Sequence, residues 1–122
     1  MNDIKFRLLK DGKVVGFEKA VLTNNTMVWA YRGVGEGDYH IHGVIFHDLK
    51  NRFTGLKDEN GKEIYGGDVL EWADMKSNPL TPKTVVVRQM ETGCWYPLTY
   101  ARGFMWKVVG NIYENPEMME VE

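Results

Sequence analysis

Residues 54–72 of the chain read TGLKDENGKEIYGGDVLEW and place two turn signals in front of a short apolar strand. In the first turn, Asp58 can hydrogen-bond its own backbone, while Gly61 supplies the positive φ that closes a tight reversal. In the second turn, Gly67 permits a sharp bend that Asp68 can tie by accepting backbone N–H bonds. Two bends this close together predict a small, strongly curved β-structure, and we expect an SH3-like barrel.

Outside this segment, the pattern is that of short strands separated by turns. Apolar and charged residues alternate over residues 4–8, and the Asp-Gly pair at 11–12 is a typical hairpin turn. A polar turn at 23–26 separates two further extended segments, and residues 39–46 are expected to form another strand. The chain is therefore predicted to be mainly β, and the Asn-Pro pair at 115–116 predicts a short terminal helical turn.

The strand pattern suggests an N-terminal β-hairpin or strand lobe followed by the barrel. We expect the N-terminal β lobe to cover residues 1–53 and the SH3-like barrel domain to cover residues 54–122. A chain of 122 residues with 43% apolar composition has enough material for one hydrophobic core. The two lobes are therefore expected either as separate domains or as parts of one compact unit.

The composition also bears on the compartment. The single cysteine, Cys94, cannot form an internal disulfide, and we expect it to be a buried free thiol in a reducing environment. No segment approaches the roughly eighteen apolar residues of a membrane span, and the first thirteen residues are too charged for a signal peptide. We expect a cytoplasmic protein of a bacterial host cell, without a membrane partner.

The segment at 54–72 resembles the signature of the YopX family of bacteriophage and prophage proteins. That pattern reads Thr-Gly-Leu, a loop of Asp, Asn and Gly, Ile-Tyr, and then Gly-Asp before apolar residues. Residues 108–117 resemble the family's closing motif and residues 4–7 its opening strand, although residues 8–10 lack the usual aromatic and acid, and Gly66 replaces a usual glutamate. The residues that carry the signature are Thr54, Gly55, Asp58, Gly61, Tyr65, Gly67, Asp68, Gly110, Asn111 and Tyr113.

The three histidines are the candidate metal ligands. His40 and His42 are two residues apart, which on a strand places both imidazoles on one face, and His47 follows shortly after. The simpler interpretation is that these histidines lie on the exposed side of a strand. We predict neither a metal nor another cofactor.

Four carboxylates lie close together in the signature, at Asp58, Glu59, Glu63 and Asp68. Paired carboxylates can act as a general acid and base when burial separates their pKa values. Here they fall in turns, where hydrogen bonding to the local backbone and solvation explain them. We predict no catalytic residues and a protein that is not an enzyme.

Nucleic-acid binding is considered because the chain has four tryptophans among fifteen aromatic side chains, which can stack on bases. The basic cluster that would contact phosphates comprises Lys5, Arg7, Lys10 and Lys13. Residues 1–53 hold eight Lys and Arg against six Asp and Glu, whereas residues 54–122 hold seven against eleven. The acidic second half is a poor phosphate surface, so nucleic-acid binding is not favoured.

Three functions are compatible with these observations. The YopX resemblance implies an uncharacterised phage or prophage accessory protein that acts without catalysis, as a homo-oligomer and with an unidentified partner protein. The first alternative is a nucleic-acid-binding β-barrel of low sequence specificity. The second is a toxin-type ribonuclease with an SH3-like barrel, for which Arg88 and Arg102 would be the residues to test.

Overall fold

The computed structural model describes residues 4–41, 43–72, 83–98 and 106–117. Within these ranges the chain is mainly β with antiparallel strand pairs, which confirms the predicted fold class. The predicted terminal helical turn is a single short 3₁₀ turn at residues 116–117. No helix in this part of the chain is long and apolar enough to cross a membrane.

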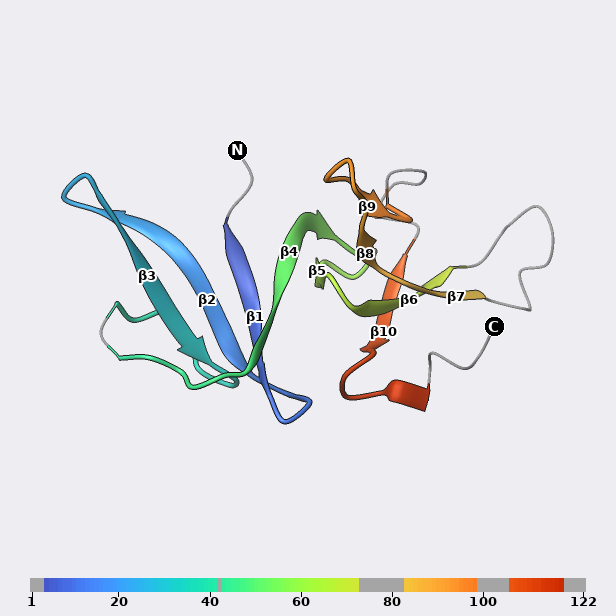
Figure 1. Ribbon diagram of the computed structural model, residues 1–122, viewed down its shortest axis with the longest axis horizontal. Helices are drawn as coiled ribbons and strands as arrows, with labels where there is room; N and C mark the ends of the chain where they lie inside the picture. Colours follow the sequence, from blue (N-terminus) through green and yellow to red (C-terminus); the bar gives the residue numbers. More distant parts are fainter. Residues whose placement is uncertain (1–3, 42, 73–82, 99–105, 118–122) are drawn as a thin grey trace. The chain divides into compact units, whose positions relative to one another are not determined.

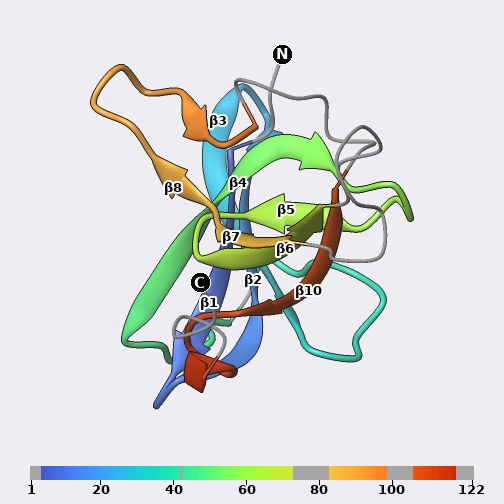
Figure 2. The ribbon, with the colours of Figure 1, turned by 90° about the vertical axis from the view of Figure 1, so that its right-hand side faces the viewer.

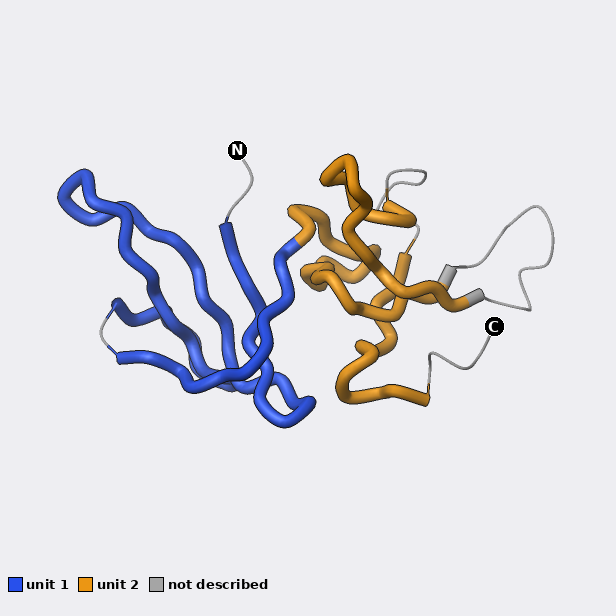
Figure 3. The backbone as a smooth tube through the Cα atoms, in the orientation of Figure 1, with its two compact units in different colours: residues 1–53 blue, residues 54–122 orange. Residues whose placement is uncertain are grey.

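The chain divides into two compact units, coloured separately in Figure 3: unit 1 is Met1–Phe53 and unit 2 is Thr54–Glu122. The strands run in the order β1 (Lys5–Lys10), β2 (Lys13–Thr23), β3 (Thr26–Gly33), β4 (Leu49–Lys57), β5 (Glu63–Tyr65), β6 (Asp68–Trp72), β7 (Lys83–Val86), β8 (Arg88–Gln89), β9 (Trp95–Tyr96) and β10 (Lys107–Asn111) (Figure 1). The sheet order is β3-β2-β1-β4-β5, in which β5 and the end of β4 belong to unit 2.

The hairpins of unit 1 follow from their turn residues. Asp11 and Gly12 join β1 to β2 with φ values of 51° and 79°, and Asn24 and Asn25 join β2 to β3 with φ values of 51° and 63°. Two consecutive positive φ values define the type I′ turn, whose twist matches that of the flanking strands. Both predicted turns are confirmed.

Residues 39–46 do not form the expected strand. In this segment only His40 is paired, through an isolated antiparallel bridge to Tyr31, among the described residues. Ile41, Val44 and Phe46 are exposed. The prediction was wrong because an apolar run becomes a strand only where a neighbouring strand offers its backbone groups.

Unit 2 holds a three-stranded sheet in the order β10-β6-β7 and a separate β8–β9 ribbon (Figure 1, Figure 2). Its buried core is formed by Ile64, Leu70, Val87, Leu98 and Trp106. β10 shifts register against β6 between Val108 and Gly110, as a β-bulge does, and bulges sharpen strand curvature. The SH3-like barrel stays a prediction.

Cys94 lies in the turn between β8 and β9 and is exposed, so the expectation of a buried thiol was wrong. Residues 91–93 of the same turn are exposed too. The turn is closed by its own backbone, with the Met90 N–H donating to the Cys94 carbonyl at 2.7 Å. A cysteine is buried when packing covers it, and a local turn does not supply that cover.

Candidate functional site

One face of the unit 1 sheet collects exposed apolar side chains. Cross-strand partners share a face, and the register pairs Leu22 with Met27 and Ala20 with Trp29. Leu22, Met27 and Trp29 are 74%, 57% and 41% exposed. Ile4, whose carbonyl accepts the Ala20 N–H at 3.0 Å, continues the same face and is also exposed. We call Ile4, Leu22, Met27 and Trp29 the apolar patch.

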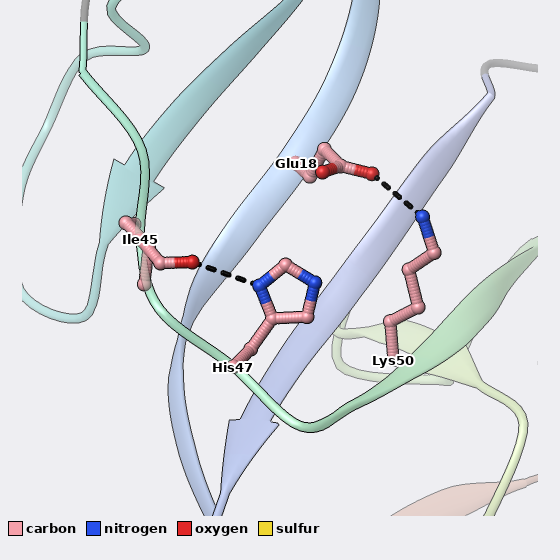
Figure 4. Close-up of polar contacts among 4 residues, drawn as sticks. All are labelled: Glu18, Ile45, His47 and Lys50. Atoms are coloured by element: carbon pink, nitrogen blue, oxygen red, sulfur yellow. Dashed lines mark hydrogen bonds and ion pairs between the residues drawn. The ribbon is translucent and has the colours of Figure 1, made fainter.

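Beside this patch, the same face holds an ion pair flanked by two aromatic rings. The Lys50 Nζ lies 3.2 Å from the Glu18 Oε1, 4.6 Å from the centroid of the Phe6 ring and 5.8 Å from that of Trp29. Figure 4 shows the Lys50 side chain reaching from β4 across β1 to Glu18 on β2. We call Phe6, Glu18, Trp29 and Lys50 the ammonium cluster.

Glu18 is the buried member of the cluster, because its side chain is 5% exposed while that of Lys50 is 45% exposed. A buried carboxylate is stable only when it is paired and hydrogen-bonded. Tyr31, the cross-strand partner of Glu18 on β3, supplies the second contact. Burial, followed by the hydrogen bond and the charge of Glu18, raises the pKa of Tyr31, so its hydroxyl stays protonated and donates to the carboxylate.

β3 is an edge strand of its sheet within the described part of the chain. Thr23 and Thr26 flank the two-residue turn, so Thr26 and every second residue after it bond inward to β2. The N–H and C=O groups of Met27, Trp29 and Tyr31 consequently point outward. Tyr31 confirms this alternation, since its N–H and C=O both pair with His40 at 2.8 Å.

The remaining outward groups of β3 belong to Met27 and Trp29. The sheet order places no strand beside them among the residues that the structure describes. The sequence from 21 to 31 also contains no charged residue and no proline. Natural edge strands are normally protected by lysines, prolines or bulges, so this edge has the properties of one that pairs with another strand.

The four candidate nucleic-acid ligands of unit 1 are not equivalent. Arg7 is buried, and its Nε and Nη2 donate to the Asn51 Oδ1 at 3.1 and 2.9 Å. The Lys5 Nζ lies 4.9 Å from the centroid of the Phe53 ring. Lys10 and Lys13 are exposed and directly opposite each other at the end of the first hairpin. The structure therefore brings together Lys10 and Lys13 and withdraws Arg7 from the surface.

Two of the three histidines, His40 and His47, lie within the residues that the structure describes. His40 is exposed, His47 donates its Nδ1–H to the Ile45 carbonyl at 2.8 Å (Figure 4), and His42 lies outside the described residues. Among the described residues, no three or more His, Cys, Asp or Glu side chains are grouped to hold a metal ion.

The signature carboxylates hold turns together. The Asp58 Oδ1 accepts the N–H groups of Asn60 and Lys62, and its Oδ2 accepts that of Val108, all at 2.9 Å. Burial raises the pKa of Asp58, but these three bonds and the Lys62 charge outweigh it and leave the pKa below its ordinary value. Asp58 therefore stays ionised, unlike a general acid poised near neutrality.

The other signature residues have structural contacts as well. The Asp68 Oδ2 accepts the Tyr65 N–H at 2.8 Å, and the Tyr65 hydroxyl donates to the Glu63 Oε1 at 2.9 Å. The Thr54 hydroxyl donates to the Ile64 carbonyl at 2.7 Å. Glu59 is exposed. These contacts show that the signature residues hold turns and neighbouring strands together.

The closing motif also contains a turn. The Asn111 Oδ1 accepts the N–H groups of Tyr113 and Glu114 at 3.0 and 2.9 Å, as an Asx turn does. Gly110 lies beside the β10 irregularity described above. Gly55, Gly61 and Gly67 all have positive φ values.

Of the two arginines in the ribonuclease hypothesis, the structure describes Arg88. The Arg88 guanidinium lies 4.8 Å from the centroid of the Tyr96 ring on β9. Arg102 lies outside the described residues. The ribonuclease activity stays a prediction.

Sequence reasoning missed the ammonium cluster. Glu18 and Lys50 are 32 residues apart and lie on β2 and β4, which are separated by β1. Strand alternation places Phe6 and Leu8 on one face, but no local signal shows that β4 pairs with β1. The cluster therefore depends on a long-range pairing that a single sequence does not reveal.

A comparison with protein families gives one assignment. The family model described as YopX protein matches residues 18–120, which is most of the chain. The chain belongs to the YopX family. The matched residues include the complete signature and three members of the apolar patch, Leu22, Met27 and Trp29. Ile4 and the rest of the opening-strand resemblance at residues 4–7 lie before the matched range.

A solved structure supports the fold of this YopX family member. The chain is similar to protein EF1440 from Enterococcus faecalis, with a TM-score of 0.56 and 21% sequence identity, covering 98% of this chain and 99% of that one. At this identity the likeness concerns the fold alone. No curated protein matches the sequence.

Proposed function

We propose that this YopX family member is a phage or prophage accessory protein that acts without catalysis, in the bacterial cytoplasm, by assembling with further copies of itself. The observation that carries the proposal is the β3 edge, where Met27 and Trp29 combine outward backbone groups with exposed apolar side chains. Adding a strand to such an edge forms main-chain hydrogen bonds and buries side chains in one step.

A second copy of β3 is a suitable occupant of this edge. Antiparallel pairing centred on Val28 brings Met27 of each copy opposite Trp29 of the other, so that all four outward-facing residues form hydrogen-bonded pairs. The arrangement is symmetric, as two-fold interfaces between identical chains are. Because residues 21–31 are uncharged, pairing brings no like charges together within this segment.

The test is the mass of the full chain in solution, measured by size-exclusion chromatography with light scattering. We expect an oligomer for the wild type and a monomer for Met27→Lys, because a lysine at an exposed edge position blocks strand pairing. Val44→Lys is the matched control, since Val44 is similarly exposed but lies outside β3. A monomeric wild type at high concentration would contradict the proposal.

Binding of nucleic acid with low specificity is the second candidate, favoured by the facing pair of Lys10 and Lys13. A contact of this kind is salt-dependent, because it releases counterions from the phosphates. A gel shift at low salt that disappears in the double variant Lys10→Gln, Lys13→Gln would support it. Absence of a shift at low salt would exclude it.

A further inference from the structure

The ammonium cluster has the chemistry of a receptor for an organic cation. Aromatic faces attract ammonium groups, and the attraction is stronger where water is excluded. Phe6 and Trp29 supply two such rings, with centroids 6.2 Å apart and planes inclined at 52°. Glu18 supplies a nearly buried carboxylate at the same place. Two rings and one carboxylate together match a single primary ammonium group with an alkyl stem.

Lys50 occupies this place in the free chain, but its position allows exchange. Its side chain is 45% exposed, and Trp29 is also open to solvent. Lys50 lies near the start of β4, where its backbone pairs with β1. Its ammonium group is carried by a long, flexible side chain, which can move away without breaking the hydrogen bonds between β1 and β4. Departure of Lys50 does not require unfolding of the sheet.

An emptied cluster would attract another cation. With Lys50 removed, Glu18 would retain the Tyr31 hydroxyl and lose its ionic partner while still buried. An uncompensated buried carboxylate is strongly unfavourable, so a replacement ammonium regains both the ion pair and the ring contacts. Ala20, which lies on the same face between Ile4 and Trp29, has a small side chain that leaves the Trp29 ring accessible.

We propose that Phe6, Glu18 and Trp29 form a binding site for one alkylammonium group, which Lys50 fills in the free chain and which a free amine or a partner's lysine side chain takes in its place. This site goes beyond self-assembly, because β3 pairing requires neither Glu18 nor Lys50. The two proposals share Trp29, so neither binding nor assembly is measured on a variant of that residue, and Trp29→Phe serves only to assign the indole signal.

The test titrates the full-length Lys50→Ala variant with n-butylammonium and follows the NMR shift of the Trp29 indole N–H, assigned with Trp29→Phe. We expect saturable binding that is at least about tenfold tighter than for the wild type, because a tethered lysine competes at an effective concentration in the roughly millimolar range. n-Butanol, which has the stem without the charge, should not bind. Absence of saturable binding to the folded variant would overturn the proposal.

The variant Glu18→Gln combined with Lys50→Ala separates the site from a general affinity for cations, and we expect it to lose binding. Retained binding there would also overturn the proposal. If Lys50→Ala does not fold, Lys50→Gln carries the same titration with a shorter, uncharged side chain. A peptide with one lysine distinguishes a partner's lysine from a free amine as the ligand, and the same peptide with norleucine in place of lysine is its uncharged control. Tighter binding of the lysine peptide than of n-butylammonium assigns the site to protein lysines. Equal binding of the two assigns it to free amines.

The assembly proposal is tested independently, because Lys50→Ala and the double variant should keep the oligomeric mass of the wild type. Loss of assembly in Met27→Lys with amine binding retained in Lys50→Ala would support both proposals. Assembly without amine binding would overturn the receptor alone.

Discussion

At the scale of single residues, Asp58 accepts three backbone N–H groups, two from its own turn and one from β10. The bonds to Asn60 and Lys62 follow from the turn chemistry of the sequence, and they are confirmed. The bond to Val108 spans fifty residues and depends on where β10 lies, so no local pattern could predict it. The cluster of Glu18 and Lys50 escaped prediction for the same reason.

Asp58→Asn should destabilise the protein by about 1–3 kcal/mol. The asparagine side chain has one oxygen that can accept hydrogen bonds, and its NH₂ group would face at least one of the backbone N–H groups that the carboxylate now binds. Urea unfolding of the full chain measures this change in the free energy of unfolding. Glu59→Gln is the control, since Glu59 is the exposed neighbouring carboxylate. Equal stabilities of the two variants would show that the three bonds contribute nothing.

The lowered pKa of Asp58 has a defined consequence for stability at acid pH. A carboxyl group whose pKa is lower in the folded chain stabilises the fold above its unfolded pKa, and this contribution is lost as the pH falls through the folded value. We expect the free energy of unfolding of the wild type to decrease more than that of Asp58→Asn below about pH 4. Parallel pH profiles would contradict the assignment.

At the scale of elements, turns were more predictable than strands. The turns at 11–12 and 23–26 depend on residues that accept positive φ, a property present in the sequence itself. The segment at 39–46 has apolar residues but only a single bridge to β3 among the described residues. Strand formation depends on a partner, which explains why composition alone misassigned it.

The turns on either side of β5, one with Gly61 before it and one with Gly67 after it, provide a matched pair of glycine substitutions. Gly67 and Gly61 have φ values of 87° and 80°, so alanine at either position should cost about 1–2 kcal/mol. A Cβ at Gly67 would also lie 2.8 Å from the Tyr113 ring, whereas none of the described residues comes within 4 Å of one at Gly61. Gly67→Ala should therefore be the more destabilising variant in urea unfolding.

The Tyr113→Ala background is the control for this comparison, because it removes the ring that the new Cβ would meet. In that background the two alanine variants should cost similar free energies. An equal cost in the wild-type background would mean that the approach of Tyr113 to Gly67 has no energetic weight.

At the scale of the whole molecule, the mainly β class and the YopX family were predictable, since both depend on motifs and spacing along the chain. The interaction surface was less predictable. The uncharged run at 21–31 becomes meaningful only when β3 is known to be an edge strand. Which strand lies at an edge is a property of the whole sheet.

Hydrogen exchange at the Met27 and Trp29 amides tests pairing at the β3 edge most directly, because both N–H groups point away from β2. We predict that both amides are protected in concentrated wild-type protein and that both lose this protection on dilution. In the Met27→Lys variant, the Trp29 amide should be unprotected even at high concentration. The Val28 amide, which bonds inward to β2, should stay protected throughout. Rapid exchange of Met27 and Trp29 at every concentration would contradict assembly through β3.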